Sequence, residues 1–234
     1  MFGIKTRLKK FLGTRKTLLH NYKILREDFA QQKCLETGSC VDKDGNPVPW
    51  ITFPAIEYIK QLDLSHARVL EYGSGFSTHF WAKRVKHVTS IEDDKSWYER
   101  MSKKMPKTVD YRLCPDEESY VNAVKSLDGQ FDIIVNDGIH RLRCGQASRD
   151  RLKDGGFIVL DNSDWCAKTA AYYRDSDLIE VDMHGFCPLN QYTMTTSFFL
   201  TRSFKPKPAH DHMPTYGPGA EHVDPKELEE WVRG

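Results

Sequence analysis

The fold of this chain is decided by the stretch Arg68-Val69-Leu70-Glu71-Tyr72-Gly73-Ser74-Gly75-Phe76-Ser77-Thr78. Its apolar start predicts a buried strand, its two glycines predict a tight turn, and a helix is expected over 77–86. Glycines in a strand-to-helix turn let the backbone approach a ligand closely, and the following helix N-terminus presents unpaired N–H groups. The stretch therefore predicts an α/β protein that holds a nucleotide-like ligand at this turn. The candidate binding residues here are Glu71, Gly73, Ser74, Gly75, Ser77 and Thr78.

Two residues distinguish this turn from a dinucleotide-binding turn. Thr78 stands where the third glycine of G-x-G-x-x-G would be. Glu71 would repel a pyrophosphate, but it suits a cationic ligand such as S-adenosylmethionine, which carries a sulfonium and an ammonium group and no phosphate. The pattern Val-Leu-Glu-x-Gly-x-Gly resembles the first motif of the class I S-adenosylmethionine-dependent methyltransferases. The alternative is an ordinary strand–turn–helix of an α/β protein.

Length and composition restrict the class of protein. The 234 residues suffice for one domain with a core and an extension. The formal net charge of +1 predicts that neither nucleic acid nor a membrane is a partner. The sequence has no apolar run of about 18 residues, and residues 1–10 lack the apolar core of a signal peptide. The six cysteines form no Cys-x-x-Cys pair, and they predict reduced thiols in a cytoplasmic protein.

Strands and helices are expected to alternate along the chain. Six further strands are predicted at 87–92, 108–114, 131–135, 157–160, 178–183 and 195–201. A helix is expected over 142–152, followed by a turn at Asp154-Gly155-Gly156. Alternation predicts a parallel sheet with crossover helices. The resemblance implies a Rossmann-like three-layer sandwich, with a mostly parallel seven-stranded sheet whose last strand is antiparallel. The predicted parts are a helical arm and lid at 1–62, an S-adenosylmethionine-binding domain at 63–204 and an extension at 205–234.

The residues before the first strand have two open interpretations. Residues 1–33 are expected to be helical and basic, and they would contact anionic lipid or an acidic partner, or pack against the domain or a second subunit. We favour packing, with a homo-oligomer contact as one role of the arm. Trp50 and Thr52 either form a lid over the cofactor or pack in the core.

Acidic residues downstream are candidates for the nucleoside part of the cofactor. Glu92 ends the second predicted strand about 20 residues after the first glycine, where a carboxylate accepts hydrogen bonds from ribose hydroxyls. Asp93 joins it as a cofactor residue, although Asp93 and Asp94 also suit capping of the next helix. Asp116 is placed to bind the adenine amino group, with helix capping as the alternative.

A second acidic group follows the fourth and fifth predicted strands. Asp137, Asp161 and Asn162 should converge, because the carboxyl ends of parallel strands meet at one edge of the sheet. Their oxygens suit Mg²⁺ or a similar divalent ion, which would lower the pKa of a substrate hydroxyl. His140 follows Asp137 by three residues and suits the role of general base near neutral pH. The alternative for Asp137 and Asp161 is cofactor contact and helix capping without an ion.

This group resembles metal-dependent O-methyltransferases. The sequence Asp137-Gly138-Ile139-His140 matches the Asp-Gly-x-His of sugar O-methyltransferases, and the region 48–201 resembles small methyltransferases of polysaccharide biosynthesis. The resemblance implies methyl transfer to a hydroxyl of a sugar, a glycan or another small molecule, with Asp137 and His140 catalytic. Asn136 departs from the pattern, because the family often has a second acid there.

Four other functions compete with O-methylation. A metal-independent N- or carboxyl-methyltransferase keeps the same cofactor, whereas a non-catalytic nucleoside-binding protein has no need of His140 or Asn162. A dehydrogenase is disfavoured by Glu71 and Thr78. A nucleic-acid methyltransferase is disfavoured by the near-neutral charge and by the absence of a Pro-Pro-Tyr-type motif.

Overall fold

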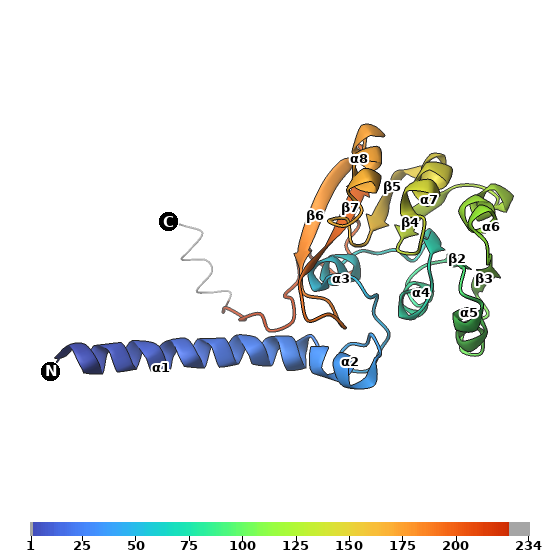
Figure 1. Cartoon of the computed structure of the whole chain (residues 1–234). Coiled ribbons are helices and arrows are strands. Elements are labelled where there is room, and N and C mark those ends of the chain that lie inside the picture. Colours follow the sequence, from blue (N-terminus) through green and yellow to red (C-terminus); the bar gives the residue numbers. More distant parts are fainter. Residues whose placement is uncertain (1, 225–234) are drawn as a thin grey trace.

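The centre of the structure is a seven-stranded sheet with the strand order β3-β2-β1-β4-β5-β7-β6 (Figure 1). The computed structural model describes residues 2–224, without the side chains of residues 2–11. The strands are β1 (Arg68–Tyr72), β2 (His87–Glu92), β3 (Val109–Leu113), β4 (Phe131–Asn136), β5 (Leu152–Leu160), β6 (Ile179–Gly185) and β7 (Met194–Leu200). The α-helices are α1 (Phe2–Lys23), α2 (Gln31–Thr37), α3 (Phe53–Lys60), α4 (Phe76–Ala82), α5 (Lys95–Ser102), α6 (Glu117–Asn122), α7 (Arg141–Ser148) and α8 (Ala167–Asp175). Short π- and 3₁₀-helical segments are η1 (Ile24–Asp28), η2 (Ala123–Ser126) and η3 (Arg149–Arg151).

Strand pairing confirms the predicted sheet. β1 pairs in parallel with β2 and β4, β2 with β3, and β4 with β5. β7 is antiparallel to both β5 and β6. The sheet is therefore mostly parallel with an antiparallel last strand, as the resemblance implies.

The central strands are apolar on both faces because helices cover both. In β1, Val69 packs in one core cluster with α3 and α4, and Leu70 packs in another with α6, α7 and α8. The paired residues Ile133 and Ile134 of β4 divide in the same way. Successive side chains of a strand point to opposite faces, so these pairs place a core on each side of the sheet. The three-layer sandwich is confirmed.

The order of the strands places a crevice between β1 and β4. From β1 the chain proceeds outward through β2 and β3, and β4 then returns to the other side of β1. Ligands of open α/β sheets bind at such a switch point, outside the carboxyl ends of the strands. The residues that follow β1, β2, β4 and β5 therefore gather at one edge of the sheet.

The start of β5 differs from the prediction. The expected helix ends at Ser148, and Gly155 and Gly156 belong to the strand instead of forming a separate turn. The pairing of β4 with β5 shifts register between Phe131 and Ile133. A Cβ on Gly156 would lie 2.4 Å from the main-chain oxygen of Asp132. The glycine pair therefore lets an irregular strand pass close to its neighbour.

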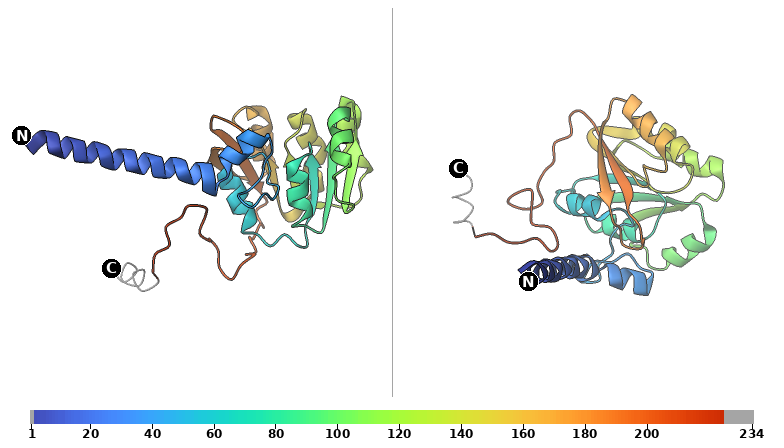
Figure 2. Two further views of the ribbon diagram at one scale, coloured as in Figure 1. Left: turned by 90° about the horizontal axis from the view of Figure 1, so that it is seen from below. Right: turned by 60° about the vertical axis from the view of Figure 1, so that its left-hand side comes forward.

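The N-terminal arm divides into two parts that differ in packing. Helix α1 projects away from the sheet, as both Figures 1 and 2 show, and its described side chains, from residue 12 to residue 23, are all exposed. After η1 the chain joins the body, where Phe29 packs against the core and Cys34 is buried. The expected packing of the arm against the domain thus holds for residues after α1 but not for α1 itself.

The segment after β7 returns along the body. The main-chain N–H of Asp63 donates to the oxygen of Lys207 at 2.8 Å, and that of Ala209 donates to Gln61 at 2.7 Å. The predicted extension is therefore tied to the end of α3 in its described part, and residues 225–234 lie outside the described residues. All six cysteines are free thiols. Among the described helices, none combines the length and apolar character needed to cross a membrane.

Candidate active site

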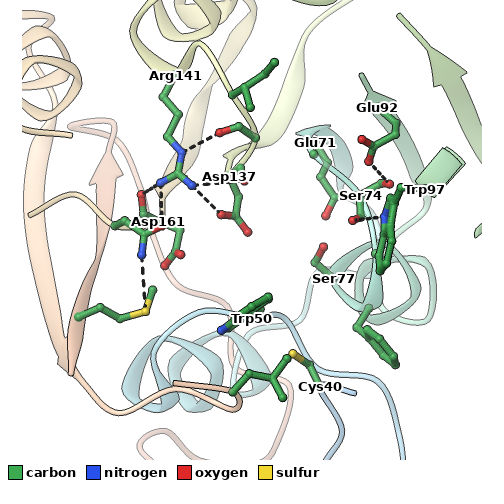
Figure 3. A pocket seen from close by; sticks show the side chains of 18 of the residues that line it. Cys40, Trp50, Glu71, Ser74, Ser77, Glu92, Trp97, Asp137, Arg141 and Asp161 are labelled. Carbon is green, nitrogen blue, oxygen red and sulfur yellow. Dashed lines mark hydrogen bonds and ion pairs between the residues drawn. The ribbon is translucent and has the colours of Figure 1, made fainter. Parts of the chain in front are cut away.

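A cavity of about 610 Å³ opens at the carboxyl ends of β1, β2, β4 and β5. Figure 3 shows two separated groups of polar side chains in it, one around Glu71 and Glu92 and the other around Asp137 and Asp161. The predicted site residues that line the cavity are Glu71, Gly73, Ser74, Gly75, Ser77, Glu92, Asp93, Asp137, Asp161 and Asn162. Three further candidates, Thr78, Asp116 and His140, do not line it.

The glycine turn after β1 lines the cavity beside the first group of polar side chains. Gly73 has a φ of +89°, a conformation that favours glycine. A Cβ on Gly73 would lie 3.2 Å from the main-chain oxygen of Asp137 and 3.2 Å from the Cα of Gly138. The turn after β1 therefore packs directly against the loop after β4, and a side chain at residue 73 has no free space.

Glu71 presents one unpaired carboxylate oxygen. The side chain is 1% exposed, and its Oε2 accepts hydrogen bonds from Thr78 at 2.6 Å and from Ser90 at 2.9 Å. Within the described part of the chain, its Oε1 has no hydrogen-bond partner. Burial raises the pKa of Glu71 to about 7, although hydrogen bonds to the carboxylate oppose the rise. A cationic ligand in the cavity would satisfy this oxygen. Thr78 is buried and does not line the cavity, and its hydroxyl donates to Glu71. Thr78 therefore orients Glu71, which corrects its expected role as a direct ligand contact.

Glu92 is buried at the end of β2. Its Oε2 accepts a hydrogen bond from Ser74 at 2.5 Å, and its Oε1 accepts from the main-chain N–H of Asp94 at 3.0 Å. Burial raises the pKa of this carboxyl. The indole of Trp97 donates to the main-chain oxygen of Ser74 at 3.0 Å and forms a flat wall of the cavity. The Ser74 hydroxyl thus orients Glu92 Oε2, the carboxylate oxygen that would accept a hydrogen bond from a ligand hydroxyl.

Capping explains two of the acids near this group. Asp94 accepts a hydrogen bond from the main-chain N–H of Trp97 at 2.9 Å and caps α5, while Asp93 lines the cavity. Asp116 is exposed and accepts from the main-chain N–H of Ser119 at 2.9 Å. Asp116 is the N-cap of α6, which corrects its expected adenine contact and favours the alternative of capping.

The second group combines two carboxylates with a guanidinium. Arg141 Nη2 lies 3.2 Å from Asp137 Oδ1, and Arg141 Nη1 donates to Asn162 Oδ1 at 3.1 Å and to the main-chain oxygen of Asp161. Thr196 donates to Asp161 Oδ1 at 2.7 Å. Burial raises the pKa of Asp137, and burial with the nearby Asp137 charge raises that of Asp161 further. Asp161 is therefore suited to hold or accept a proton at this end of the cavity.

His140 lies elsewhere. Its Nδ1 is 3.3 Å from Glu117 Oε1 on α6, and Arg143 also pairs with Glu117, at 2.5 Å. His140 adopts a left-handed conformation with a φ of +52° at the start of α7, and its exposed side chain stands outside the cavity. His140 is therefore not brought together with the other predicted site residues, and its role as a general base stays a prediction.

The predicted divalent-ion site does not fit the observed contacts. Arg141 already binds the side-chain oxygens of Asp137 and Asn162 that would be ligands. Among the described residues, no group of three His, Cys, Asp or Glu side chains is placed to hold a metal ion. Asn136, the departure from the family pattern, is fully buried and donates to the main-chain oxygen of Arg141 at 2.8 Å.

Aromatic side chains form the rim next to the second group. Trp165 and Tyr192 are both more than half exposed, at 65% and 51%, with ring centroids 6.1 Å apart. Trp50, a lid candidate, also lines the cavity and donates to Asn190 Oδ1 at 3.1 Å. Thr52 is instead fully buried, with its hydroxyl bonded to the main-chain oxygen of Met183 at 2.9 Å. The prediction missed Arg141, Trp165 and Tyr192, although Trp165 closely follows Asp161 and Arg141 follows Asp137 by one helical turn.

Comparisons with known proteins found similar solved structures. No family model matches the sequence, and no curated protein matches it either. Similar solved structures include the N-methyltransferase NodS from Bradyrhizobium japonicum, with 16% identity, 58% of this chain and 85% of that chain covered, and a TM-score of 0.44. A methyltransferase-like protein from Silicibacter pomeroyi has 19% identity, coverage of 80% and 96%, and a TM-score of 0.45. An rRNA methylase from Streptococcus thermophilus has 18% identity, coverage of 62% and 93%, and a TM-score of 0.43. Similarity at this level carries no argument about activity, and the Rossmann-like fold predicted from the sequence is confirmed by the order and direction of the strands.

Proposed function

We propose that this protein is an S-adenosylmethionine-dependent methyltransferase that acts on a hydroxyl of an uncharged acceptor. The observation that carries the proposal is the unpaired oxygen of buried Glu71 in the cavity beside the glycine turn. A buried carboxylate oxygen without a partner is costly, and a ligand ammonium would supply the missing donor. The same cavity continues to Asp137 and Asp161, where an acceptor would meet the methyl group.

The charges in the cavity favour this cofactor over phosphate-bearing ones. Of the described residues that line it, Arg141 is the only basic one, and its guanidinium is bonded to Asp137 and Asn162. Nucleotide phosphates would therefore meet carboxylates without a free cation. We expect Glu92 and Ser74 to bind the ribose hydroxyls and the indole of Trp97 to stack on the adenine ring, since all three line the cavity.

The reaction requires a base in the second group. The bound cofactor supplies an electrophilic methyl group on a sulfonium. Asp161 would accept the proton of the acceptor hydroxyl, whose oxygen then forms the bond to the methyl carbon as the carbon–sulfur bond breaks. Asp161 is the better candidate than His140, since Asp161 lines the cavity and its pKa is raised by burial. Arg141 pairs with Asp137 and opposes the rise in the pKa of Asp137 that burial causes.

The aromatic rim supports an uncharged acceptor. Trp50, Trp165 and Tyr192 offer flat apolar faces in the same cavity as Asp161, without a free lysine or arginine among the described lining residues. Sugar rings present C–H faces that stack on indoles and hydroxyls that reach carboxylates. We therefore propose a sugar, a glycan or another hydroxylated small molecule, which agrees with the resemblance in the sequence. Exclusion of nucleic acid stays a prediction, based on the net charge of +1.

Cofactor binding provides the first test. Calorimetry should detect heat with S-adenosylmethionine and S-adenosylhomocysteine, and none with NAD. Glu92→Ala should weaken S-adenosylhomocysteine binding by about 1.5–3 kcal/mol, because hydrogen bonds to a charged group are lost. Glu99→Ala, at an exposed residue of α5 paired with Lys95, is the matched control and should leave the affinity unchanged. Absence of heat with both sulfur compounds would refute the proposed function.

The acceptor end can be tested separately. Trp165→Ala should raise the KM for the acceptor by several-fold, equivalent to about 0.5–1.5 kcal/mol of aromatic contact. Trp165→Phe should retain most of the aromatic contact and therefore raise the KM for the acceptor less than Trp165→Ala does. Cofactor affinity should be unchanged in both variants. Methyl transfer from radiolabelled cofactor to a panel of sugars gives the measurement. An unchanged KM in Trp165→Ala would show that the rim does not bind the acceptor.

A further inference from the structure

Arg141 connects three segments at the acceptor end of the cavity. It is the first residue of α7, and its side chain is only 16% exposed. Its Nε donates to the main-chain oxygen of Gly138 at 2.9 Å, while the two Nη atoms reach the loops after β4 and β5 (Figure 3). The position of the helix start is itself fixed by Asn136, which donates to the Arg141 main-chain oxygen at 2.8 Å.

Three acceptors of Arg141 in the loops after β4 and β5 are oxygen types that a hard cation binds. They are the carboxylate Oδ1 of Asp137, the main-chain oxygen of Asp161 and the amide Oδ1 of Asn162. Carboxylate, carbonyl and amide oxygens are typical ligands of Mg²⁺ and Mn²⁺. The planar guanidinium binds these oxygens through directed N–H hydrogen bonds, whereas a spherical metal ion would bind them by coordination.

The arrangement also fixes the loop that carries the aromatic rim. Asn162 has a left-handed conformation with a φ of +48°, and the N–H of Trp165 donates to the main-chain oxygen of Asn162 at 2.9 Å. Arg141 binds this strained residue through its side chain at 3.1 Å. Removal of the guanidinium would free the loop after β5 from the loop after β4.

We propose that Arg141 is the resident cation of this site, which takes the position of a divalent ion between Asp137, Asp161 and Asn162 and holds the loops after β4 and β5 together. Arg141 is a positioning residue: it acts on the cavity through Asp137, Asp161 and Asn162. The proposal stands on these contacts alone and does not depend on methyl transfer. It implies that the wild-type protein has no affinity for a divalent ion here, and that loss of the guanidinium creates such affinity.

Binding of Mn²⁺ to the full-length protein, followed by electron paramagnetic resonance, tests the proposal. The wild type and Arg143→Ala, the control at an exposed arginine two residues along α7, should show no saturable binding. Arg141→Ala should gain one Mn²⁺ site with a dissociation constant of about 10⁻⁴–10⁻³ M, the range of weak oxygen sites. The double variant Arg141→Ala/Asp137→Asn should lose that site again, because a charged ligand is removed.

Two results would overturn the proposal. One is Mn²⁺ binding by the wild type that disappears in Asp137→Asn, a measurement that does not require the arginine variant to fold. The other is a folded Arg141→Ala, checked by circular dichroism, without a gain of Mn²⁺ binding. Arg141→Gln provides the same comparison with a side chain closer in size. These measurements need neither cofactor nor acceptor, so their failure is distinguishable from failure of the proposed function.

Discussion

Gly73→Val should abolish binding of S-adenosylmethionine, with no heat detectable by calorimetry. A valine at a φ of +89° is strained by its branched Cβ, and that Cβ would lie 3.2 Å from main-chain atoms of Asp137 and Gly138, which would have to shift to accommodate it. The turn would move into the space beside Glu71 where we place the cofactor.

Gly155 provides a matched control for this experiment. It has a φ of +81°, close to that of Gly73, but a Cβ there has no atom within 4 Å. Gly155→Val carries the same backbone strain far from the cavity, so it should lose stability while it keeps cofactor affinity. Wild-type affinity in a folded Gly73→Val would show that the turn after β1 is not the cofactor site. Gly73→Ala gives the same comparison if the valine variant does not fold.

Asp161→Asn should lower kcat by about 10²- to 10⁴-fold, the usual contribution of a general base, and leave cofactor affinity nearly intact. Burial and the charge of Asp137 raise the pKa of Asp161, so the base is protonated and inactive at low pH. Activity of the wild type should therefore rise with pH through this raised pKa, at a higher pH than for an ordinary aspartate. The variant should lose that dependence.

Two neighbouring residues serve as controls for the base. Asp164→Asn changes an exposed aspartate three residues away and should leave kcat unchanged. His140→Ala should also retain activity, because His140 pairs with Glu117 outside the cavity. A loss in His140→Ala as large as that in Asp161→Asn would restore the histidine as the base and contradict our assignment.

The sequence was sufficient to predict the sheet and the convergence of its acids. A short, strongly apolar run such as 131–135, bounded by turn residues, favours a central strand, and parallel strands bring Glu71, Glu92, Asp137 and Asp161 to one edge regardless of loop detail. The tight turn after the first strand could also be predicted from its two glycines, Gly73 and Gly75, because both adopt conformations that favour glycine.

The sequence predictions of site residues fail where the direction of a side chain determines whether it reaches the cavity. The spacing Asp-Gly-x-His pointed to His140, but the chain turns sharply before α7, so the next residue, Arg141, faces the cavity instead. Residue spacing cannot distinguish these two neighbours before the left-handed conformation of His140 is known. Similarly, the sequence around Asp116 is compatible with a helix cap and with a ligand contact. Only the position of the cavity, which Asp116 does not line, distinguishes the two roles.

The free-standing helix α1 divides the protein into two cooperative units. Its 22 residues extend about 33 Å at 1.5 Å per residue, and its described side chains are all exposed. A helix without tertiary contacts depends on its own propensity, because most helical stability in proteins comes from packing of one face against a core. Its amide hydrogens are therefore expected to exchange with solvent through local opening at a free energy near zero, while those of β1 exchange only on global unfolding of the sheet.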